Sequence, residues 1–342
     1  MIKKINLRQL RNHQSLELTF DQSFAYIHGL NGSGKTSVLE AIYFCATTKS
    51  HRTSDEKDLI MSGEPFAHVK LWTDQDKYEV VLSKTGKRAS INGVEKRKIS
   101  DFIGHLRVVM FAPEDLELIQ GSPQERRQFI DLEWMQLNKN YLRYLNTYKN
   151  VLKQRNSLLK KITLDDDYTF LNILGDQLYE VGSKIIEERR TFITELNEIF
   201  QETYKRFSPH IVELIYQPDV DERAFLNALK KNQKQDILYQ ATLAGPHRDD
   251  LNFRFNGFEA KSYASQGEQR LMVIALKLAL LALIKKKTNQ QVTLLLDDVL
   301  SELDEERQKL FLKELPNEHQ IIMNSTHMIE GAHIQMIHLK KE

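Results

Sequence analysis

The stretch that decides the fold reads Gly29-Leu30-Asn31-Gly32-Ser33-Gly34-Lys35-Thr36. It fits the pattern G-x-x-x-x-G-K-[ST] at every fixed position. The apolar segment 24–28 precedes it, and a helical pattern of apolar residues follows from Val38 to Ile42. Glycines let backbone N–H groups turn inward around phosphate oxygens, and a following helix points the positive end of its dipole at the same anion. The sequence therefore predicts a phosphate-binding loop, residues 29–36, between a strand and a helix.

Two side chains of the phosphate-binding loop are expected to carry chemistry. Lys35 would reach the β- and γ-phosphates of ATP, and the Thr36 hydroxyl would ligate Mg²⁺. A glycine-rich turn arising by chance is the alternative, and the strand and helix on either side argue against it. The residues expected to bind the nucleotide here are Gly29, Leu30, Asn31, Gly32, Ser33, Gly34, Lys35 and Thr36.

A second element is the apolar run Thr293–Leu296, which ends in Asp297 and Asp298. Asp297 is the expected Mg²⁺ ligand, bound directly or through water. Asp298 is expected to orient or deprotonate the water that attacks the γ-phosphate. A strand that simply enters a turn is the alternative, but a phosphate-binding loop in the same chain favours the functional interpretation.

A third element, Ser265-Gln266-Gly267-Glu268-Gln269-Arg270, opens a long apolar helix. A hydroxyl and free N–H groups at a helix start form an anion site, although an ordinary helix cap uses the same residues. The place of this element in the chain favours the anion site over an ordinary cap, because ABC-type ATPases carry their signature motif between the phosphate-binding loop and the acidic strand. Ser265, Gly267 and Gln269 are the expected nucleotide contacts, and Ser265, Lys35 and Asp298 are the expected catalytic residues.

The order of these motifs resembles that of ABC-type ATPases. The segment 301–304 is similar to their D-loop, and His327 is similar to their switch histidine, with a surface or capping histidine as the alternative. In this class two heads enclose two ATP molecules, and the signature of one protomer touches the γ-phosphate held by the other. The resemblance implies an ATP-dependent homodimer, with ATP and Mg²⁺ as cofactors.

Several further stretches resemble the bacterial RecF family. They are spread along nearly the whole chain: Leu39–Tyr43, Ser50–Thr53, Pro113–Asp131, Gly245–Asp250 and Leu296–Asp304. Too few residues separate Thr36 from Ser265 for the long coiled coils of the related SMC proteins. The resemblance implies an α/β fold, namely a P-loop ABC-type ATPase head with a mixed sheet, flanking helices and an inserted, mainly helical lobe.

Patterning along the chain agrees with such an insertion. Strand patterns dominate the N-terminal part and return near the C-terminus, whereas 123–207 has a helical pattern. We expect head segments at 1–112 and 245–342, an inserted lobe at 113–244, and one sheet shared by the two ends. Gly175 and Gly182 are expected to mark bends or close packing in the lobe.

The RecF resemblance implies a ligand, an enzymatic activity and protein partners. It implies binding of double-stranded DNA, including gap junctions with single strands, slow DNA-stimulated ATP hydrolysis, and action with RecR and RecO in loading RecA during repair. Three departures stand out: Leu10-Arg11-Asn12-His13 in place of Phe-Arg-Asn-Tyr, Glu268 in place of glutamine, and Glu114 and Asp115 in place of a clear glutamine.

Composition limits how DNA could be bound. The formal net charge is only +1, so a DNA surface must come from local clusters, for which solvated faces are the alternative. One candidate cluster holds Lys84, Lys87, Arg88, Lys96, Arg97 and Lys98, and a second holds Lys49, His51, Arg52 and Lys57.

Two features favour a cytoplasmic protein without a membrane segment. The single cysteine, Cys45, lies in an apolar helical stretch and is expected in the core of a protein from a reducing compartment. The apolar run Leu271–Ile284 is shorter than the roughly 20 residues that span a bilayer, so a buried helix is expected.

Three rival functions remain open at this point. The nucleotide-binding subunit of a membrane transporter would show the same motif order. A small-molecule kinase would share the phosphate-binding loop without needing a signature helix. A protein that uses ATP only as a structural clamp would share every motif and lack turnover.

Overall fold

The computed structural model describes residues 1–53, 55–325 and 333–340 and divides the chain into two compact units. Unit 1 comprises Met1–Leu116, Arg206–Ser208 and Gln266–Glu342, and unit 2 comprises Glu117–Lys205 and Pro209–Ser265. These boundaries differ from the expected ones, since residues 245–265 belong to unit 2. The reason is strand pairing: β10 (Asp250–Phe255) pairs with β9 (Val212–Gln217) inside unit 2.

Unit 1 contains an antiparallel sheet with the order β2-β1-β4-β5-β6-β7. Its strands are β1 (Ile2–Leu10), β2 (His13–Thr19), β4 (Phe66–Thr73), β5 (Lys77–Ser83), β6 (Gly86–Ile91) and β7 (Val94–Glu95). Burial along β5 alternates residue by residue, as expected for a sheet with one face in the core. The turn from β6 to β7 has positive φ at Asn92 (53°) and Gly93 (81°), as is typical of a tight hairpin turn.

The second sheet of unit 1 is parallel, with the order β14-β3-β13-β12-β8. Its strands are β3 (Phe24–Gly29), β8 (Val108–Phe111), β12 (Thr293–Asp297), β13 (Gln320–Asn324) and β14 (Ile334–Leu339). Every residue of β8, β12 and β13 is buried, as is typical of parallel strands covered on both faces. Strands from both ends of the chain lie in this sheet, which confirms that the two ends share one sheet.

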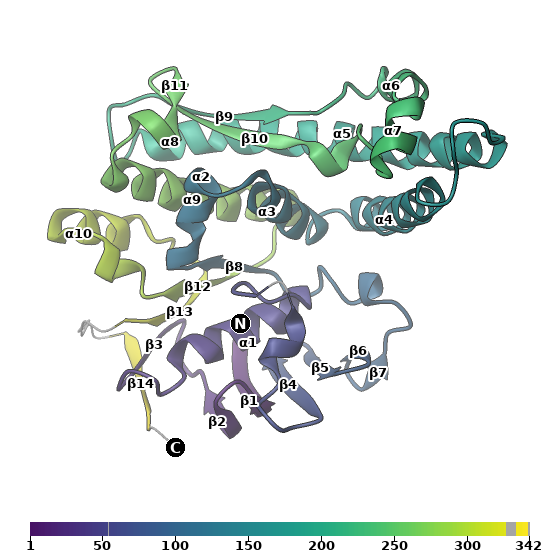
Figure 1. Cartoon of the computed structure of the whole chain (residues 1–342). Coiled ribbons are helices and arrows are strands. Elements are labelled where there is room, and N and C mark those ends of the chain that lie inside the picture. Colours follow the sequence, from purple (N-terminus) through teal and green to yellow (C-terminus); the bar gives the residue numbers. More distant parts are fainter. Residues whose placement is uncertain (54, 326–332, 341–342) are drawn as a thin grey trace. The chain divides into compact units, whose positions relative to one another are not determined.

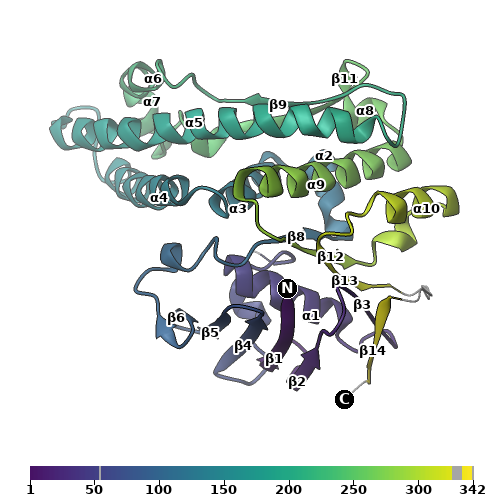
Figure 2. The ribbon, with the colours of Figure 1, turned by 180° about the vertical axis from the view of Figure 1, so that it is seen from behind.

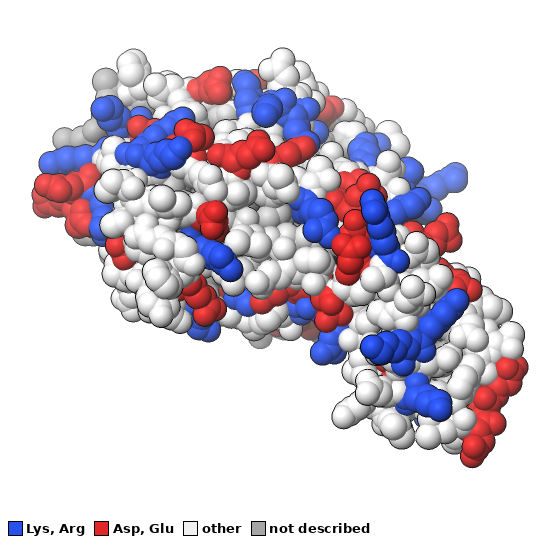
Figure 3. All heavy atoms as spheres, turned by 90° about the horizontal axis from the view of Figure 1, so that it is seen from above, with Lys and Arg blue, Asp and Glu red and all other residues white. Residues whose placement is uncertain are grey.

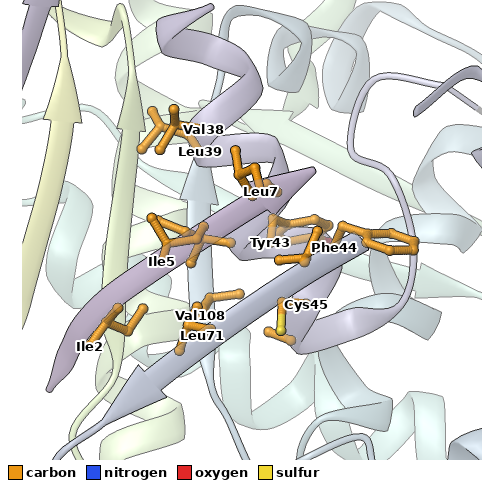
Figure 4. Close-up of a cluster of buried hydrophobic side chains, with 14 of the residues drawn as sticks. Ile2, Ile5, Leu7, Val38, Leu39, Tyr43, Phe44, Cys45, Leu71 and Val108 are labelled. Carbon is orange, nitrogen blue, oxygen red and sulfur yellow. The ribbon is translucent and has the colours of Figure 1, made fainter. Parts of the chain in front are cut away.

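Helix α1 (Lys35–Thr47) packs against strands of both sheets and is buried at every residue from Ser37 to Thr47 (Figure 1). Figure 4 shows side chains of α1, Cys45 among them, meeting those of Ile5 on β1, Leu71 on β4 and Val108 on β8. Cys45 is therefore a core residue, as predicted, and its burial raises the pKa of the thiol. The helix that follows the phosphate-binding loop is thus fixed from two sides.

The remaining helices of unit 1 include the predicted apolar one. Helix α9 (Gln266–Thr288) buries nearly all of the run Leu271–Ile284, and no helix among the described residues is long and apolar enough to span a membrane. The unit also holds η1 (Glu56–Leu59), η2 (Ile99–Asp101), η3 (Pro113–Leu116), η5 (Val299–Glu302) and α10 (Glu305–Glu314).

Unit 2 is mainly helical. Its helices are α2 (Glu117–Gln120), α3 (Pro123–Met135), α4 (Lys139–Leu159), α5 (Thr169–Tyr204), α6 (Phe225–Lys231), α7 (Gln233–Tyr239), η4 (Pro246–Arg248) and α8 (Ala260–Tyr263). The long helix α5 packs against α4 and against the small sheet β11-β10-β9, in which β11 spans Phe258–Glu259 (Figure 2).

A buried ion-pair network organises unit 2. The guanidinium of Arg189 lies 2.9 Å from the Asp131 carboxylate and 2.8 Å from the Asp249 carboxylate, and all three side chains are largely buried. Arg126 holds the Asp250 carboxylate at 2.6 Å. Residues 126–131 of one family-like stretch and Asp249 and Asp250 of another therefore meet inside unit 2, where these acids are paired with arginines.

Candidate functional site

The phosphate-binding loop joins the carboxyl end of β3 to the start of α1. Gly32 and Gly34 have φ of +79° and +88°, where a side chain would be strained. A Cβ on Gly34 would lie 2.2 Å from His13 Nε2, and a Cβ on Gly29 would lie 2.4 Å from the carbonyl oxygen of Leu339. Positions 29 and 34 therefore require glycine. With these glycines, the loop can fold tightly around a small anion.

Two side chains of the loop point to phosphate chemistry. Lys35 Nζ donates to the carbonyl oxygens of Gly29 at 2.8 Å and Leu30 at 3.1 Å, so its ammonium group lies across the loop. The Ser33 hydroxyl oxygen is buried without a hydrogen-bond partner among the described residues. A fixed cation and an unused buried hydroxyl fit the oxygens of a triphosphate.

Thr36 and Asp297 meet at the ends of α1 and β12. The Thr36 hydroxyl donates to Asp297 Oδ1 at 2.8 Å, and the Asn324 amide donates to the same oxygen at 2.7 Å. Burial raises the pKa of Asp297, while the hydrogen bonds from Asn324 and Thr36 oppose the rise. A carboxylate and a hydroxyl at this separation form a donor pair of the kind that holds Mg²⁺.

Asp298 follows directly in a left-handed conformation, with φ of 50°. Its backbone N–H donates to the Asn324 side-chain oxygen at 2.8 Å, which fixes the turn. Asn324 was not predicted as a site residue, because its place beside Asp297 follows only from the pairing of β13 with β12. The available signal was a polar residue at the carboxyl end of a predicted strand.

A cavity of about 510 Å³ joins these parts. Its wall consists of Asn12, Asn31, Gly32, Gly34, Lys35, Thr36, Ser37, Arg52, Asp297, Asp298, Asn324 and Ser325. The structure therefore brings the predicted loop, the predicted Mg²⁺ ligands and Asp298 to one space of suitable size for a nucleotide.

The turn between β1 and β2 supplies residues that sequence reasoning left out of the site. The Asn12 amide donates to the Gly32 carbonyl at 3.3 Å, and His13 Nε2 lies 3.1 Å from the Gly34 carbonyl oxygen. His13 occupies the position where the family pattern has tyrosine, and it contacts the loop backbone through its ring nitrogen.

The carboxylate of Glu40 connects two more of the family-like stretches. Arg11 grips it with two hydrogen bonds of 2.9 and 2.8 Å, and the Ser50 hydroxyl donates to it at 2.5 Å. Glu40 is completely buried, and its hydrogen bond raises the pKa of Arg11. The segments that flank the nucleotide cavity are thereby tied to α1.

The two acids after β8 have different surroundings. Asp115 is buried, accepts from the Ala112 N–H at 2.8 Å and lies 2.7 Å from Lys277 Nζ on α9. Glu114 is about half exposed and lies 3.4 Å from Arg52, which lines the cavity. Of the pair, Glu114 is the acid adjacent to the nucleotide cavity.

The predicted signature residues lie in the first turn of α9 and directly before it. Gly267 lies in the first turn of α9 and Gln269 is buried in the same helix, and neither lines the cavity among the described parts of unit 1. Ser265 is the last residue of unit 2, directly before α9. His327 lies outside the residues that the structure describes.

Several side chains of the two basic clusters form ion pairs within unit 1. Lys87 and Lys49 both pair with Glu56, and His51 is buried beside Asp115. Exposed members are Lys84, Arg88, Arg97 and Lys98 of the first cluster and Lys49, Arg52 and Lys57 of the second. Basic and acidic side chains are interspersed over the face shown in Figure 3, in keeping with the small net charge.

Comparison with protein-family models shows that residues 1–340 match the RecF/RecN/SMC N terminal domain. A DNA replication and repair protein RecF from Acholeplasma laidlawii is 54% identical over 97% of this chain and 95% of that protein. A protein of the same name from Agathobacter rectalis is 42% identical over 94% of this chain and 91% of the relative.

Solved structures agree with the sequence relatives. One, described as the recombination mediator protein RecF with ATP in the RecFOR pathway, superposes with a TM-score of 0.92 at 32% identity, covering 98% of this chain and 95% of the other. An Smc head from Pyrococcus furiosus superposes with a TM-score of 0.52 at 18% identity over 95% of this chain and 89% of the other, which is a likeness of fold. The expected fold class, an α/β P-loop ATPase head with an inserted helical unit, is confirmed, but unit 1 has one antiparallel and one parallel sheet in place of the expected mixed sheet.

Proposed function

The chain belongs to the RecF family, and from this premise we propose that it is an ATPase of DNA replication and repair that dimerises on ATP and then binds double-stranded DNA. The observation that carries the proposal is the cavity in which Lys35, Thr36, Asp297 and Asp298 converge. An ABC-type head with this cavity binds a nucleoside triphosphate and uses its hydrolysis as a switch.

The proposed roles follow from the contacts. The loop backbone from Gly29 to Gly34 cradles the phosphates, and the Lys35 ammonium offsets the charge of the β- and γ-phosphates. Thr36 and Asp297, whose oxygens lie 2.8 Å apart, would hold Mg²⁺, which supplies further positive charge at the phosphates. Asp298 orients the attacking water, from a turn that Asn324 fixes.

The signature completes the site in trans. Ser265, Gly267 and Gln269 approach the γ-phosphate in the loop of a second copy, which accounts for the absence of Gly267 and Gln269 from the wall of the cavity described in unit 1. His327 is proposed as a further γ-phosphate contact on the basis of the motif order alone.

DNA and protein partners are proposed from family membership. The partners are double-stranded DNA with gap junctions, RecR, RecO and RecA, and the role is to help RecA load during recombinational repair and replication-fork maintenance. A relative's description as a recombination mediator of the RecFOR pathway supports this assignment. Hydrolysis is proposed to be slow and stimulated by DNA.

A transporter subunit is the weaker alternative. It has no need of the stretches 126–131 and 245–250, whereas here their residues form the ion-pair network that organises unit 2. The relatives with the highest identity above are DNA replication and repair proteins.

A duplex-binding titration tests the proposal. Fluorescence anisotropy of labelled duplex DNA would be measured with ATP, with ADP and without nucleotide, from about 50 to about 200 mM salt. The expected result is tight binding only with ATP, with an affinity that falls steeply as salt rises, because Lys and Arg side chains displace counterions from phosphates. Equal DNA affinity in all three nucleotide conditions would contradict the proposal.

A further inference from the structure

Basic side chains gather at one edge of the antiparallel sheet of unit 1. The sheet ends with β6 and β7, which Figure 1 shows at the side away from β2. The chain after β7 stays beside β6, because the Lys96 N–H donates to the Ala89 carbonyl oxygen at 2.9 Å. The turn from β5 into β6 brings one more lysine to the same strand. The residues that form this edge cluster are Lys84, Arg88, Lys96, Arg97 and Lys98.

The cations of the edge cluster have few acidic partners. The Arg88 side chain is 80% exposed, and its guanidinium lies 3.9 Å from the Glu95 carboxylate. The other four cations form no ion pair within the part of the chain that the structure describes. The segment 84–101 holds only two acids, Glu95 and Asp101. Positive charge therefore dominates this edge, although the formal net charge of the whole chain is only +1.

The neighbouring basic residues have partners inside unit 1. Lys87 Nζ lies 3.4 Å from the Glu56 carboxylate, and burial lowers the pKa of this ammonium group. Lys49 pairs with the same carboxylate, and Arg52 lies 3.4 Å from Glu114. These three cations already neutralise acids of the protein, so of the two candidate clusters the edge cluster is the one with charge to offer a ligand.

A hollow beside Lys84 continues the basic surface. It has a volume of about 300 Å³ and is lined by the segment 60–64 together with Lys57 and Lys84, both of which are exposed. Its one acid, Glu64, accepts a hydrogen bond from the Gln9 amide. The surface that runs from the hollow to Lys98 is therefore extended, open and positively charged, which suits a long anion.

Protection of the sheet edge does not account for this charge. Charged side chains on an edge strand keep it from pairing with other chains, but either sign of charge serves that purpose. Strand β7 has only two residues and leaves little edge to protect. A cluster of one sign on a nearly neutral chain instead indicates a polyanionic partner.

We propose that the edge cluster binds the phosphate backbone of double-stranded DNA. Lys and Arg side chains contact backbone phosphates without reading bases. Proteins that bind single strands also use aromatic side chains on which bases stack, and the segment 84–98 contains no aromatic residue. None of the five residues lines the nucleotide cavity described in unit 1, so ATP and DNA use separate surfaces of this unit. This inference rests on the proposed function, because it assigns the DNA of that function to named residues.

Duplex titrations of a triple variant test the inference. With ATP at about 50 mM salt, Lys96→Ala/Arg97→Ala/Lys98→Ala should bind labelled duplex DNA at least about tenfold more weakly than wild type. The slope of log affinity against log salt concentration should become shallower by about 2 to 3, because each phosphate contact contributes about 0.9. Hydrolysis of ATP in the absence of DNA should keep the wild-type rate, because the nucleotide cavity is unchanged.

Two further variants serve as controls. Lys153→Ala/Lys160→Ala/Lys161→Ala removes three exposed lysines of unit 2 and should bind duplex DNA within about twofold of wild type. Lys96→Arg/Lys98→Arg keeps both charges and should retain wild-type affinity, because contacts with backbone phosphates depend mainly on charge. Weak binding by this second control would show that the lysine side chains have a structural role, and would refute the inference.

The outcomes separate the inference from the proposed function. If wild type binds duplex DNA only with ATP and the triple variant matches its affinity and salt slope, the inference is overturned and the proposed function stands. Weaker binding with an unchanged slope, or an equal loss in the unit 2 control, would also overturn the inference. Wild-type protein that shows no ATP-dependent duplex binding would overturn the proposed function, and the inference with it.

Discussion

At the scale of single residues, the sequence predicts the phosphate-binding loop and the acids well, because one local pattern specifies both backbone and chemistry. Lys35, Thr36, Asp297 and Asp298 line one cavity. Asn12, His13 and Asn324 could not be predicted as their neighbours, since they come from strands whose proximity depends on sheet order.

The first prediction concerns the cation of the loop. Lys35→Ala should weaken ATP binding by about 10- to 100-fold, because hydrogen bonds to a charged group contribute about 1.5–3 kcal/mol. Isothermal titration with ATP and Mg²⁺ measures the change. Lys49→Ala, which removes a surface lysine paired with Glu56, should bind ATP as wild type does. Similar losses in both variants would contradict the role given to Lys35.

The second prediction concerns the buried carboxylate of Glu40. Arg11→Ala should lower the free energy of unfolding by about 3–5 kcal/mol, since it leaves a buried charge without its partner. Urea unfolding measures the loss. The control, Lys205→Ala, breaks an exposed pair with Glu202 and should leave the midpoint unchanged. A loss no larger than that of the control would show that Glu40 is stabilised by other groups.

At the scale of elements, alternation predicted most strands of the two sheets of unit 1. Helical periodicity predicted α9 and a helical region at 123–207, which consists of α3, α4 and α5. Strands β9 and β14 were not predicted. Both are only partly buried, so their sequence patterns carry little information. The pairing partners of β10 also lay beyond sequence reasoning, because they decide which unit residues 245–265 join.

Helix α5 offers a matched pair of glycine substitutions. A Cβ on Gly182 would lie 2.5 Å from the Phe225 ring and 3.0 Å from the Tyr148 ring, so Gly182→Ala should destabilise the protein by about 1–3 kcal/mol. Gly175 has no neighbour within 4 Å of such a Cβ among the described residues, so Gly175→Ala should stabilise it by about 0.4–1 kcal/mol. Thermal unfolding compares the two. Stabilisation by both would mean that α5 and α6 separate readily at Gly182.

At the scale of the whole molecule, the family-like stretches predicted the fold because they are distributed from one end of the chain to the other. The phosphate-binding loop and Asp297 lie far apart in sequence, and the shared parallel sheet brings them together. Predicted boundaries fell at the ends of strand patterns, whereas the units are set by pairing and packing. The proposed second copy of the chain explains why the signature residues described in unit 1 do not line its cavity.

Sedimentation velocity of Asp298→Asn with ATP, Mg²⁺ and a short DNA duplex tests the central claim most directly. Asparagine tolerates the left-handed backbone of position 298, so the turn is retained while the carboxylate that orients water is removed. The account predicts a species that contains two 40.0 kDa chains and one duplex with ATP, which reverts to single chains with ADP. A chain that stays single with saturating ATP and duplex would contradict it.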